Sequence, residues 1–195
     1  MVNREIFSEY EKLFIEENHK VNLISKNDEK FLWEKHICDS LALEEFFNKY
    51  NKPREMLDIG TGGGFPSVPL AVIYPEIKIY ALDSIAKKIR AVSVFKEKLG
   101  LKNLIPVCKR AEKFDKNFEF ITSRAVSSLK NICEYALPKL KKDGYFVAFK
   151  SRKLQEEIEE ANPILKKYGA KVIDIIPYNL PSEQDLERYL AVIKG

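Results

Sequence analysis

The stretch DIGTGGGFPSVPL, residues 58–70, holds the residues whose types and spacing best suit a chemical role. Its run of glycines lets the backbone approach a ligand closely. A dinucleotide-binding fingerprint of the G-x-G-x-x-G type that begins at Gly60 needs a glycine at position 65, which is occupied by Phe65. No Gly-Lys-[Ser/Thr] follows, which also argues against a phosphate-binding loop of that type. We interpret the stretch as a loop for a different adenosine-containing ligand.

Two carboxylates favour S-adenosylmethionine as this ligand. Asp58 makes the pattern D-x-G-x-G-x-G, and a carboxylate near the loop suits the ammonium group of S-adenosylmethionine, which has no pyrophosphate to hold. Asp83 follows Gly60 by 23 residues, at the end of a predicted strand, where a carboxylate can accept both ribose hydroxyls. The structural alternatives are a helix cap at Asp83 and a plain strand–turn–helix loop.

The elements that must position these residues change character at Pro53. Before it, Ile6, Tyr10, Leu13 and Phe14 fall on one face of a predicted helix, and further helices are expected at 28–36 and 38–50. After it, short apolar strands alternate with helices, which is typical of a mainly parallel sheet covered on both faces. The expected strands are 56–60, 77–83, 103–108, 118–123, 143–150, 170–178 and 187–195. The last two have no helix between them and should pair antiparallel at an edge.

These elements predict an α/β fold, namely the Rossmann-like seven-stranded fold of class I S-adenosylmethionine-dependent methyltransferases with an N-terminal helical extension. The length of 195 residues suits a single domain. We expect one methyltransferase domain over 1–195, with a helical part at 1–53 and an α/β cofactor-binding core at 54–195.

Positive charge is concentrated in the middle of the chain. Residues 51–153 carry 21 basic and 10 acidic side chains, whereas residues 1–50 carry 7 and 11, and residues 154–195 carry 5 and 8. This asymmetry favours a polyanionic partner, although lysine-rich solvated helix faces give the same pattern.

The expected cellular location and the expected lack of a metal site both depend on motifs that the sequence does not contain. It shows no secretory signal and no apolar run of membrane-spanning length, and its three widely spaced cysteines suit reduced thiols. No Cys or His cluster has zinc spacing, so we expect no metal site. These features predict a cytoplasmic protein without membrane attachment.

The pattern of motifs also narrows the methylated group. Amino-group methylation of adenine or cytosine usually needs [DNS]-P-P-[FYW] after the fourth strand, where residues 122–125 read TSRA. Methylation of a pyrimidine carbon needs a nucleophilic cysteine, commonly after proline, and none of the cysteines follows proline. Small-molecule and protein substrates stay open on these grounds.

The segments HICDSL, DIGTGGGFPSVPL, ALDSIAKKIR, KRAEKF, FEFITSRAVSSL and FVAFKS occur in this order. In this combination the chain, from about Asn22 to Lys194, resembles the glucose-inhibited division protein B family, the bacterial small-subunit ribosomal RNA guanine-N7 methyltransferases. Ser67 stands where a glycine is common in that family. The resemblance implies S-adenosylmethionine as cofactor and ribosomal RNA, within the small ribosomal subunit, as partner of a monomeric enzyme.

The expected site combines the residues that the spacing and the resemblance indicate. The cofactor-binding set is Asp58, Gly60, Thr61, Gly62, Phe65, Asp83, Ser84, Ala111, Glu112 and Arg124. The substrate-side set, with positioning roles implied by the resemblance, is Arg124, Lys150, His36, Asn22 and Lys87. From the residues alone, a surface or helix-capping histidine is the better interpretation of His36, whereas Asn22 could equally be a turn cap, and Lys87 and Glu112 could equally be solvated side chains.

N7 of guanine carries a lone pair and no proton, so transfer to it needs alignment rather than a catalytic base. The lack of an evident acid–base pair agrees with this chemistry. Two other functions stay open from the sequence: a methyltransferase for a small metabolite, and a non-catalytic module that binds S-adenosylmethionine.

Overall fold

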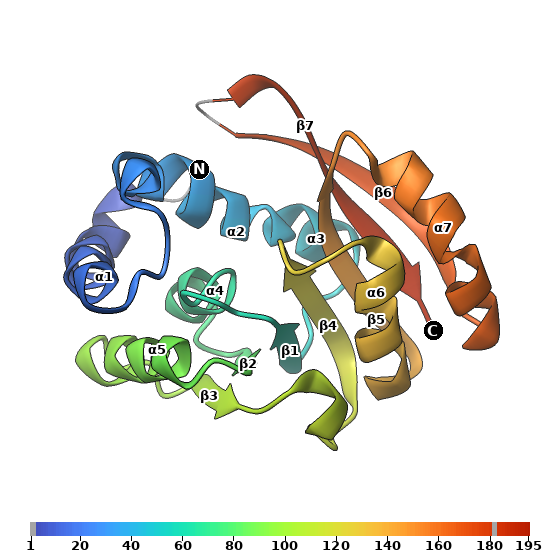
Figure 1. Cartoon of the computed structure of the whole chain (residues 1–195), viewed down its shortest axis with the longest axis horizontal. Helices are drawn as coiled ribbons and strands as arrows, with labels where there is room; N and C mark the ends of the chain where they lie inside the picture. Colours follow the sequence, from blue (N-terminus) through green and yellow to red (C-terminus); the bar gives the residue numbers. More distant parts are fainter. Residues whose placement is uncertain (1–2, 181–182) are drawn as a thin grey trace.

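The computed structural model describes residues 3–180 and 183–195, with side chains from 183 to 186 left aside. Seven strands form one sheet in the order β3-β2-β1-β4-β5-β7-β6 (Figure 1). The strands are β1 (Glu55–Ile59), β2 (Lys78–Asp83), β3 (Leu104–Cys108), β4 (Phe118–Arg124), β5 (Leu140–Ser151), β6 (Lys171–Leu180) and β7 (Glu183–Lys194). The predicted seven-stranded α/β fold is therefore confirmed.

The sheet is parallel from β3 to β5, and β7 runs antiparallel between β5 and β6. The order reverses at β1, which pairs with β2 on one side and β4 on the other. In sheets of this kind ligands bind beyond the carboxyl ends of the strands at such a reversal. The glycine loop follows β1 directly, so the topology places it there.

Helices cover both faces of the sheet. The N-terminal helices, α4 and α5 pack on one face, and α6 and α7 pack on the other (Figure 1). Side chains along a strand point alternately to the two faces of the sheet. In β2, Ile79 and Ala81 pack with the N-terminal helices, α4 and α5, whereas Leu82 packs with α6 and α7. The helices are α1 (Ser8–Val21), α2 (Asp39–Leu41), α3 (Leu43–Lys49), α4 (Ser67–Ile73), α5 (Ala86–Lys98), α6 (Leu129–Ala136) and α7 (Leu154–Lys167).

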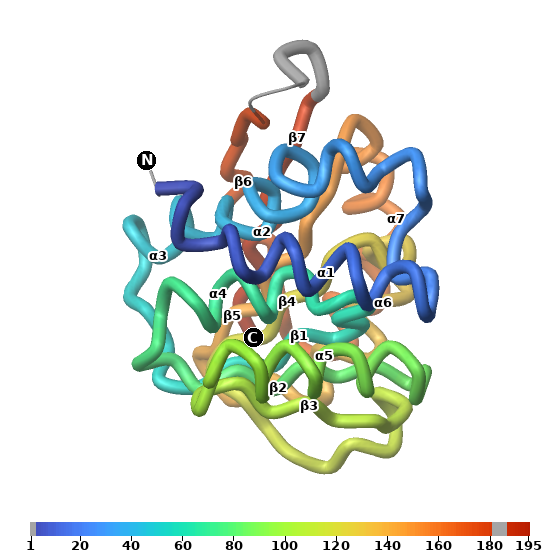
Figure 2. The backbone as a smooth tube through the Cα atoms, turned by 90° about the vertical axis from the view of Figure 1, so that its left-hand side faces the viewer, coloured from blue at the N-terminus to red at the C-terminus, as the bar shows by residue number. Residues whose placement is uncertain are grey.

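The N-terminal segment wraps the outside of the first helical layer. Figure 2 shows α1 crossing on the outer side of α4 and α5. Tyr10 and Phe14 are buried as predicted, but Ile6 is exposed and Phe7 is buried in its place. The reason is that Arg4–Phe7 form a 3-10 turn before α1, which changes the phase of the helix face.

Short irregular helices replace the regular helix predicted at 28–36. A 3-10 helix, Lys26–Phe31, leads into a π-helix, Leu32–Cys38, which continues into α2. The π-helix carries His36 and ends one residue before Asp39, so both side chains face the carboxyl end of β4. Such π turns occur frequently at functional sites. The further 3-10 turns are Ala111–Lys113 and Leu137–Lys139.

Candidate functional site

A cavity of about 650 Å³ opens at the carboxyl ends of β1, β2, β3 and β4. Its volume lies within the range of about 300–1,000 Å³ that is usual for small-molecule sites. Residues of the predicted cofactor set that line it are Gly60, Thr61, Gly62, Phe65, Asp83, Ser84, Ala111, Glu112 and Arg124. The geometry therefore brings nine of the ten predicted cofactor residues to one cavity.

Backbone contacts hold the glycine loop against β2. The amides of Gly60 and Thr61 both donate to the carbonyl of Leu82, at 2.8 and 2.9 Å. Gly60 has φ of +78°, and a Cβ atom there would lie 2.3 Å from Cγ2 of Val126. Both the left-handed backbone and this close approach require glycine.

Asp83 connects the loop with the start of α5. Its Oδ2 accepts from the Gly62 amide at 2.9 Å, and its Oδ1 accepts from the Ile85 amide at 2.8 Å. The side chain thus shapes the cavity wall that it also lines. Ribose binding by Asp83 stays a prediction. The structure adds a second role, in which Asp83 holds the glycine loop through the Gly62 amide.

Asp58 lies beneath the cavity rather than on its wall. The residue is fully buried, and its Oδ2 accepts from Ser67 Oγ at 2.7 Å. Burial raises the pKa of Asp58 to about 7. This position corrects the expectation that its carboxylate meets the ligand's ammonium: Asp58 supports the loop from inside the protein.

Thr61 presents a hydroxyl that suits a polar ligand. Its Oγ1 is buried, and the neighbouring Asp58 carboxyl is a hydrogen-bond acceptor within its reach. Thr61 lines the cavity. Because a hydroxyl both donates and accepts, it can also bond with the carboxylate or the ammonium of a bound ligand.

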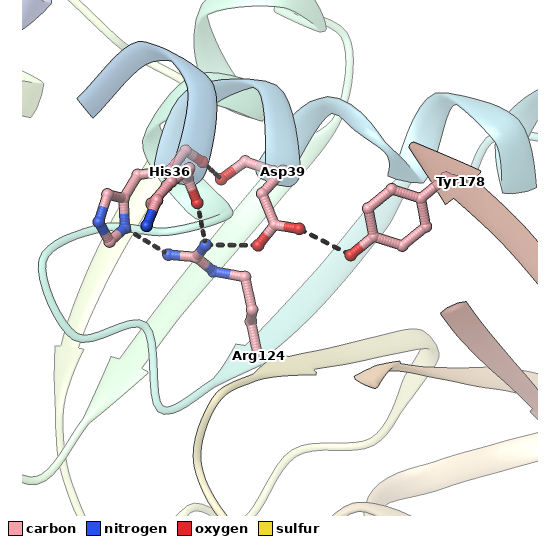
Figure 3. Close-up of polar contacts among 6 residues, drawn as sticks. His36, Asp39, Arg124 and Tyr178 are labelled. Carbon is pink, nitrogen blue, oxygen red and sulfur yellow. Dashed lines mark hydrogen bonds and ion pairs between the residues drawn. The ribbon is translucent and has the colours of Figure 1, made fainter. Parts of the chain in front are cut away.

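Arg124 stands at the boundary between this cavity and a second one. Its Nη1 donates to Asp39 Oδ2 at 2.6 Å and to the Lys35 carbonyl at 3.3 Å (Figure 3). Tyr178 donates to the other carboxylate oxygen of Asp39 at 2.6 Å. The Arg124 guanidinium also lies 5.1 Å from the centre of the Phe65 ring. Asp39 is 4% exposed, so the ion pair is held in a largely dry setting.

His36 completes this cluster as a neutral side chain. Its Nδ1 lies 3.3 Å from Arg124 Nη2, which has only hydrogens to offer, so Nδ1 accepts and the ring proton is assigned to Nε2. Burial, followed by the nearby Arg124 charge, lowers the pKa of His36 to about 4. The ring also packs 5.1 Å from Phe65. Neither the surface nor the capping interpretation describes this position.

The second cavity, of about 380 Å³, shares His36, Arg124 and Ala125 with the first. Lys150, which the sequence predicts on the substrate side, lines it and donates to Glu157 Oε2 at 2.7 Å. The other lining residues are Asp28, Lys35, Asp39, Phe149, Ser151, Glu157, Tyr178 and Arg188. Two adjoining cavities with Arg124 between them can hold a cofactor and an acceptor side by side.

Two predicted substrate-side residues lie away from both cavities. Asn22 is exposed and takes a left-handed conformation at the end of α1, with φ of 51°, which is the turn-capping alternative. Lys87 is exposed on α5, and neither cavity includes it, whereas its neighbour Lys88 lines the first cavity. The substrate-side roles of Lys87 and Asn22 therefore stay predictions, which neither cavity supports, and Lys88 is the lysine of α5 that faces the cofactor cavity.

Sequence reasoning missed the residues that hold Arg124 in place. Asp39 lies within the segment HICDSL, and Tyr178 lies near the end of β6, 139 residues further along the chain. The sequence indicates only that this segment contains an acidic residue. No spacing rule predicts that Asp39 contacts Tyr178. In the first cavity, Tyr135 was missed, whereas Lys88, Lys109 and Arg110 belong to the basic middle of the chain, part of which was expected beside the cofactor.

The model of the family described as rRNA small subunit methyltransferase G matches residues 3–184. The chain belongs to this family. A ribosomal RNA small subunit methyltransferase G from Lactococcus lactis is 36% identical over 194 residues, covering 96% of this chain and 81% of the relative. One from Staphylococcus haemolyticus is 38% identical, covering 97% of this chain and 80% of the relative.

Solved structures share the fold of this family member at low sequence identity. A SAM-dependent methyltransferase from Aquifex aeolicus aligns with a TM-score of 0.63 and 19% identity, covering 88% of this chain and 98% of that one. An rRNA methylase from Streptococcus thermophilus aligns with a TM-score of 0.56 and 14% identity, covering 80% and 94%. These likenesses confirm the predicted methyltransferase fold.

Proposed function

We propose that this chain transfers the methyl group of S-adenosylmethionine to N7 of a guanine in small-subunit ribosomal RNA. The observation that carries the proposal is the pair of adjoining cavities with Arg124 and His36 at their boundary, in a chain of the rRNA small subunit methyltransferase G family. The relatives' names give the small-subunit RNA, and the resemblance noted in the sequence gives the N7 position.

The residues of the first cavity fit S-adenosylmethionine. The glycine loop leaves room for a ligand against the backbone, and the Thr61 hydroxyl on the cavity wall can bond with a polar end of that ligand. Asp83 would hold the ribose, and the 3-10 turn that begins with Ala111 and Glu112 would border the adenine. When bound, S-adenosylmethionine supplies a methyl group on a positively charged sulfur.

Alignment and exclusion of water are what the protein's own residues contribute. Because N7 has no proton to lose, none of these residues has to act as a base. Asp39 and Tyr178 fix the Arg124 guanidinium, which can hold the carboxylate of the cofactor or a phosphate of the RNA. His36 is neutral and packs against Phe65, so it closes the boundary without adding a cation beside the sulfonium.

The surroundings of the cavities suit RNA. Cations line the first cavity at Lys88, Lys109 and Arg110, and the second at Lys35 and Lys150. N7 lies on the major-groove edge, which is too deep in an A-form helix for side chains to reach. The target guanine should therefore be unpaired or swung out of its stack when it enters the site.

The setting of the reaction belongs to the same proposal. We infer that the chain works as a single domain, since residues of the N-terminal part and of the α/β core together line both cavities. A monomer is the proposed oligomeric state. The assembled small subunit is the proposed form of the substrate, and the cytoplasm, where bacterial ribosomes form, is the proposed location. Among the described residues, no helix has the length and apolar character to span a bilayer.

Labelling with tritiated S-adenosylmethionine tests the proposal. Small subunits and free ribosomal RNA from a bacterial strain that lacks the gene for this chain are incubated with the protein, and the labelled nucleotide is then mapped. We expect label on one guanine, and borohydride reduction followed by aniline, which is specific for N7-methylguanine, should cleave the RNA at that position. If neither RNA substrate accepts label, the RNA assignment fails and a small metabolite takes its place.

A pair of neighbouring lysines gives a matched control. Lys88→Ala should slow labelling by about tenfold, because Lys88 lines the cofactor cavity, whereas Lys87→Ala should stay near the unmodified rate. Equal rates for the two variants would show that the cavity wall has been assigned to the wrong residues.

A further inference from the structure

The second cavity contains a carboxylate group whose surroundings suit recognition of one particular base. We propose that this cavity receives the target guanine and that Glu157 selects it by accepting a hydrogen bond from the N2 amino group at its open carboxylate oxygen. The inference rests on the proposed function, because it identifies which residue reads the base whose N7 is methylated.

The arrangement of the two cavities sets the direction in which the base must face. The shared residues His36, Arg124 and Ala125 form the boundary with the cofactor cavity, so N7 has to point toward them. In guanine, N7 belongs to the five-membered ring, and the N2 amino group lies at the far end of the six-membered ring. With N7 toward the boundary, the amino group that distinguishes guanine from adenine therefore faces the far wall, which consists of residues that line only the second cavity.

Three carboxylates lie on that far wall among the described residues: Asp28, Asp39 and Glu157. Both oxygens of Asp39 are already bonded, to Arg124 and Tyr178, and the residue is nearly fully buried. Asp39 can therefore stabilise the wall but cannot read a base.

Glu157 is held firmly and keeps one oxygen open. Its Oε2 accepts from Lys150 Nζ and from the Leu129 amide, while no described residue forms a hydrogen bond with Oε1. The side chain is 23% exposed and lies on α7, a regular helix. Asp28 accepts from Ser25 within a short 3-10 helix, and sites on regular helices are held more accurately than those on short irregular segments.

A carboxylate at this place distinguishes the purines by its chemistry. Guanine presents an N2 amino group, from which the open Oε1 can accept, whereas adenine has no amino group at C2 and presents a lone pair at N1 that would be repelled. Enzymes that act on a flipped base read it by such bonds to its Watson–Crick edge. Phe149 and Tyr178 supply aromatic surface in the same cavity.

Inosine separates this role from a structural one, because it differs from guanosine only by lacking the N2 amino group. Small subunits are reconstituted with guanosine or inosine at the mapped target position, and single-turnover labelling rates are compared. The unmodified protein should prefer guanosine by at least about tenfold, as expected for a hydrogen bond to a charged group. Glu157→Gln should reduce the preference to about twofold or less.

The control is Glu156→Gln, the same change in the same turn of α7 on an exposed side chain that lines neither cavity. It should keep the full preference. Because the preference is a ratio within one variant, partial loss of the Leu129 contact or of folded protein cancels from it. If Glu157→Gln labels too slowly, binding of guanosine and inosine monophosphates to the protein saturated with S-adenosylhomocysteine gives the same ratio by NMR titration.

Retention of the full preference by Glu157→Gln overturns the inference, as does loss of the preference in Asp28→Asn alone. Absence of label on guanosine subunits with the unmodified protein is a different result, since it removes the proposed function itself. A flattened preference in Glu157→Gln with normal discrimination in Glu156→Gln supports Glu157 as the residue that reads the base.

Discussion

The two cavities share Arg124, yet the chain builds them in different ways. The first is made mainly of the loops that follow neighbouring parallel strands, at 59–65, 82–88, 109–112 and 124–126. The second joins the N-terminal irregular helices, the end of β5, the start of α7 and the β6–β7 hairpin. The first therefore depends on strand order and local loop sequence, and the second depends on contacts between segments far apart in the chain.

This difference shows which cavity a substitution should damage. Changes in the glycine loop should act on the cofactor and leave the rest of the fold in place. Changes to the cluster of Arg124, Asp39 and Tyr178 should act on stability and on the substrate side together, since this cluster connects α2 with β4 and β6.

The largest expected effect comes from Arg124→Ala. It would leave Asp39 buried with only Tyr178 as a partner, and breaking a buried ion pair in this way costs about 3–5 kcal/mol of unfolding free energy. Urea denaturation followed by circular dichroism measures this loss. Arg90→Ala, on an exposed side chain of α5, should change the unfolding free energy by less than about 0.5 kcal/mol.

A double variant sharpens the interpretation of that loss. Arg124→Met combined with Asp39→Leu removes both charges, and we expect it to recover most of the lost stability while methylation stays absent. If the double variant is no more stable than Arg124→Ala, the uncompensated Asp39 charge is not the cause of the loss.

The next effect is expected at the cofactor cavity. Asp83→Ala removes the acceptor for the Gly62 and Ile85 amides together with the predicted ribose contact, and should weaken S-adenosylmethionine binding by about 1.5–3 kcal/mol. Calorimetry measures this, with Asp115→Ala as the exposed control. Unchanged affinity, or binding of NAD by the unmodified protein, would contradict the cofactor assignment.

The sequence predicted the first cavity well because its signals are local. Gly60, Phe65 and Asp83 sit at fixed distances from strand ends, and a parallel sheet brings those ends to one edge. The strand pattern itself follows from alternation of apolar segments with helices, including the antiparallel pair β6 and β7. The sequence did not predict that Asp58 is buried, because a motif gives the order of the residues and does not distinguish a side chain on the cavity wall from one beneath the loop.

The second cavity was predicted only in part, because its geometry is tertiary. Asp39 and Tyr178 meet across most of the chain, and no local pattern records the contact. The choice between Lys87 and Lys88 depends on the phase of α5, where one residue turns a side chain by about 100° around the axis. His36 was named by resemblance, but its neutral state follows from burial and from Arg124.

A smaller effect should appear on acidification, at the boundary between the cavities. The folded-state pKa of His36, about 4, lies below its ordinary value of 6.5, so the unfolded chain binds more protons between these values and stability is lost as pH falls through them. We expect the unmodified protein to lose about 1–2 kcal/mol relative to His36→Asn from pH 6.5 to 4, with allowance for the side chain's partial exposure.

Urea denaturation at intervals across this range measures the difference, and the other titrating groups, which are present in both proteins, largely cancel. A constant difference in unfolding free energy between the unmodified protein and His36→Asn would show that His36 is not held neutral by the fold.

The smallest effect concerns the transfer step itself, where the two cavities meet. Between pH 6.5 and 8.5, the single-turnover rate at saturating cofactor should vary by less than about twofold, because N7 loses no proton and a general base would give a titrating limb. His36 titrates well below this range, but the pKa of Asp58, about 7, falls inside it. A flat profile therefore means that Asp58 acts only as the buried support of the loop. If the rate instead changes near pH 7 and this change disappears in Asp58→Asn, the protonation state of Asp58 affects methyl transfer through the glycine loop. A tenfold rise in rate per pH unit that persists in Asp58→Asn would contradict the N7 mechanism.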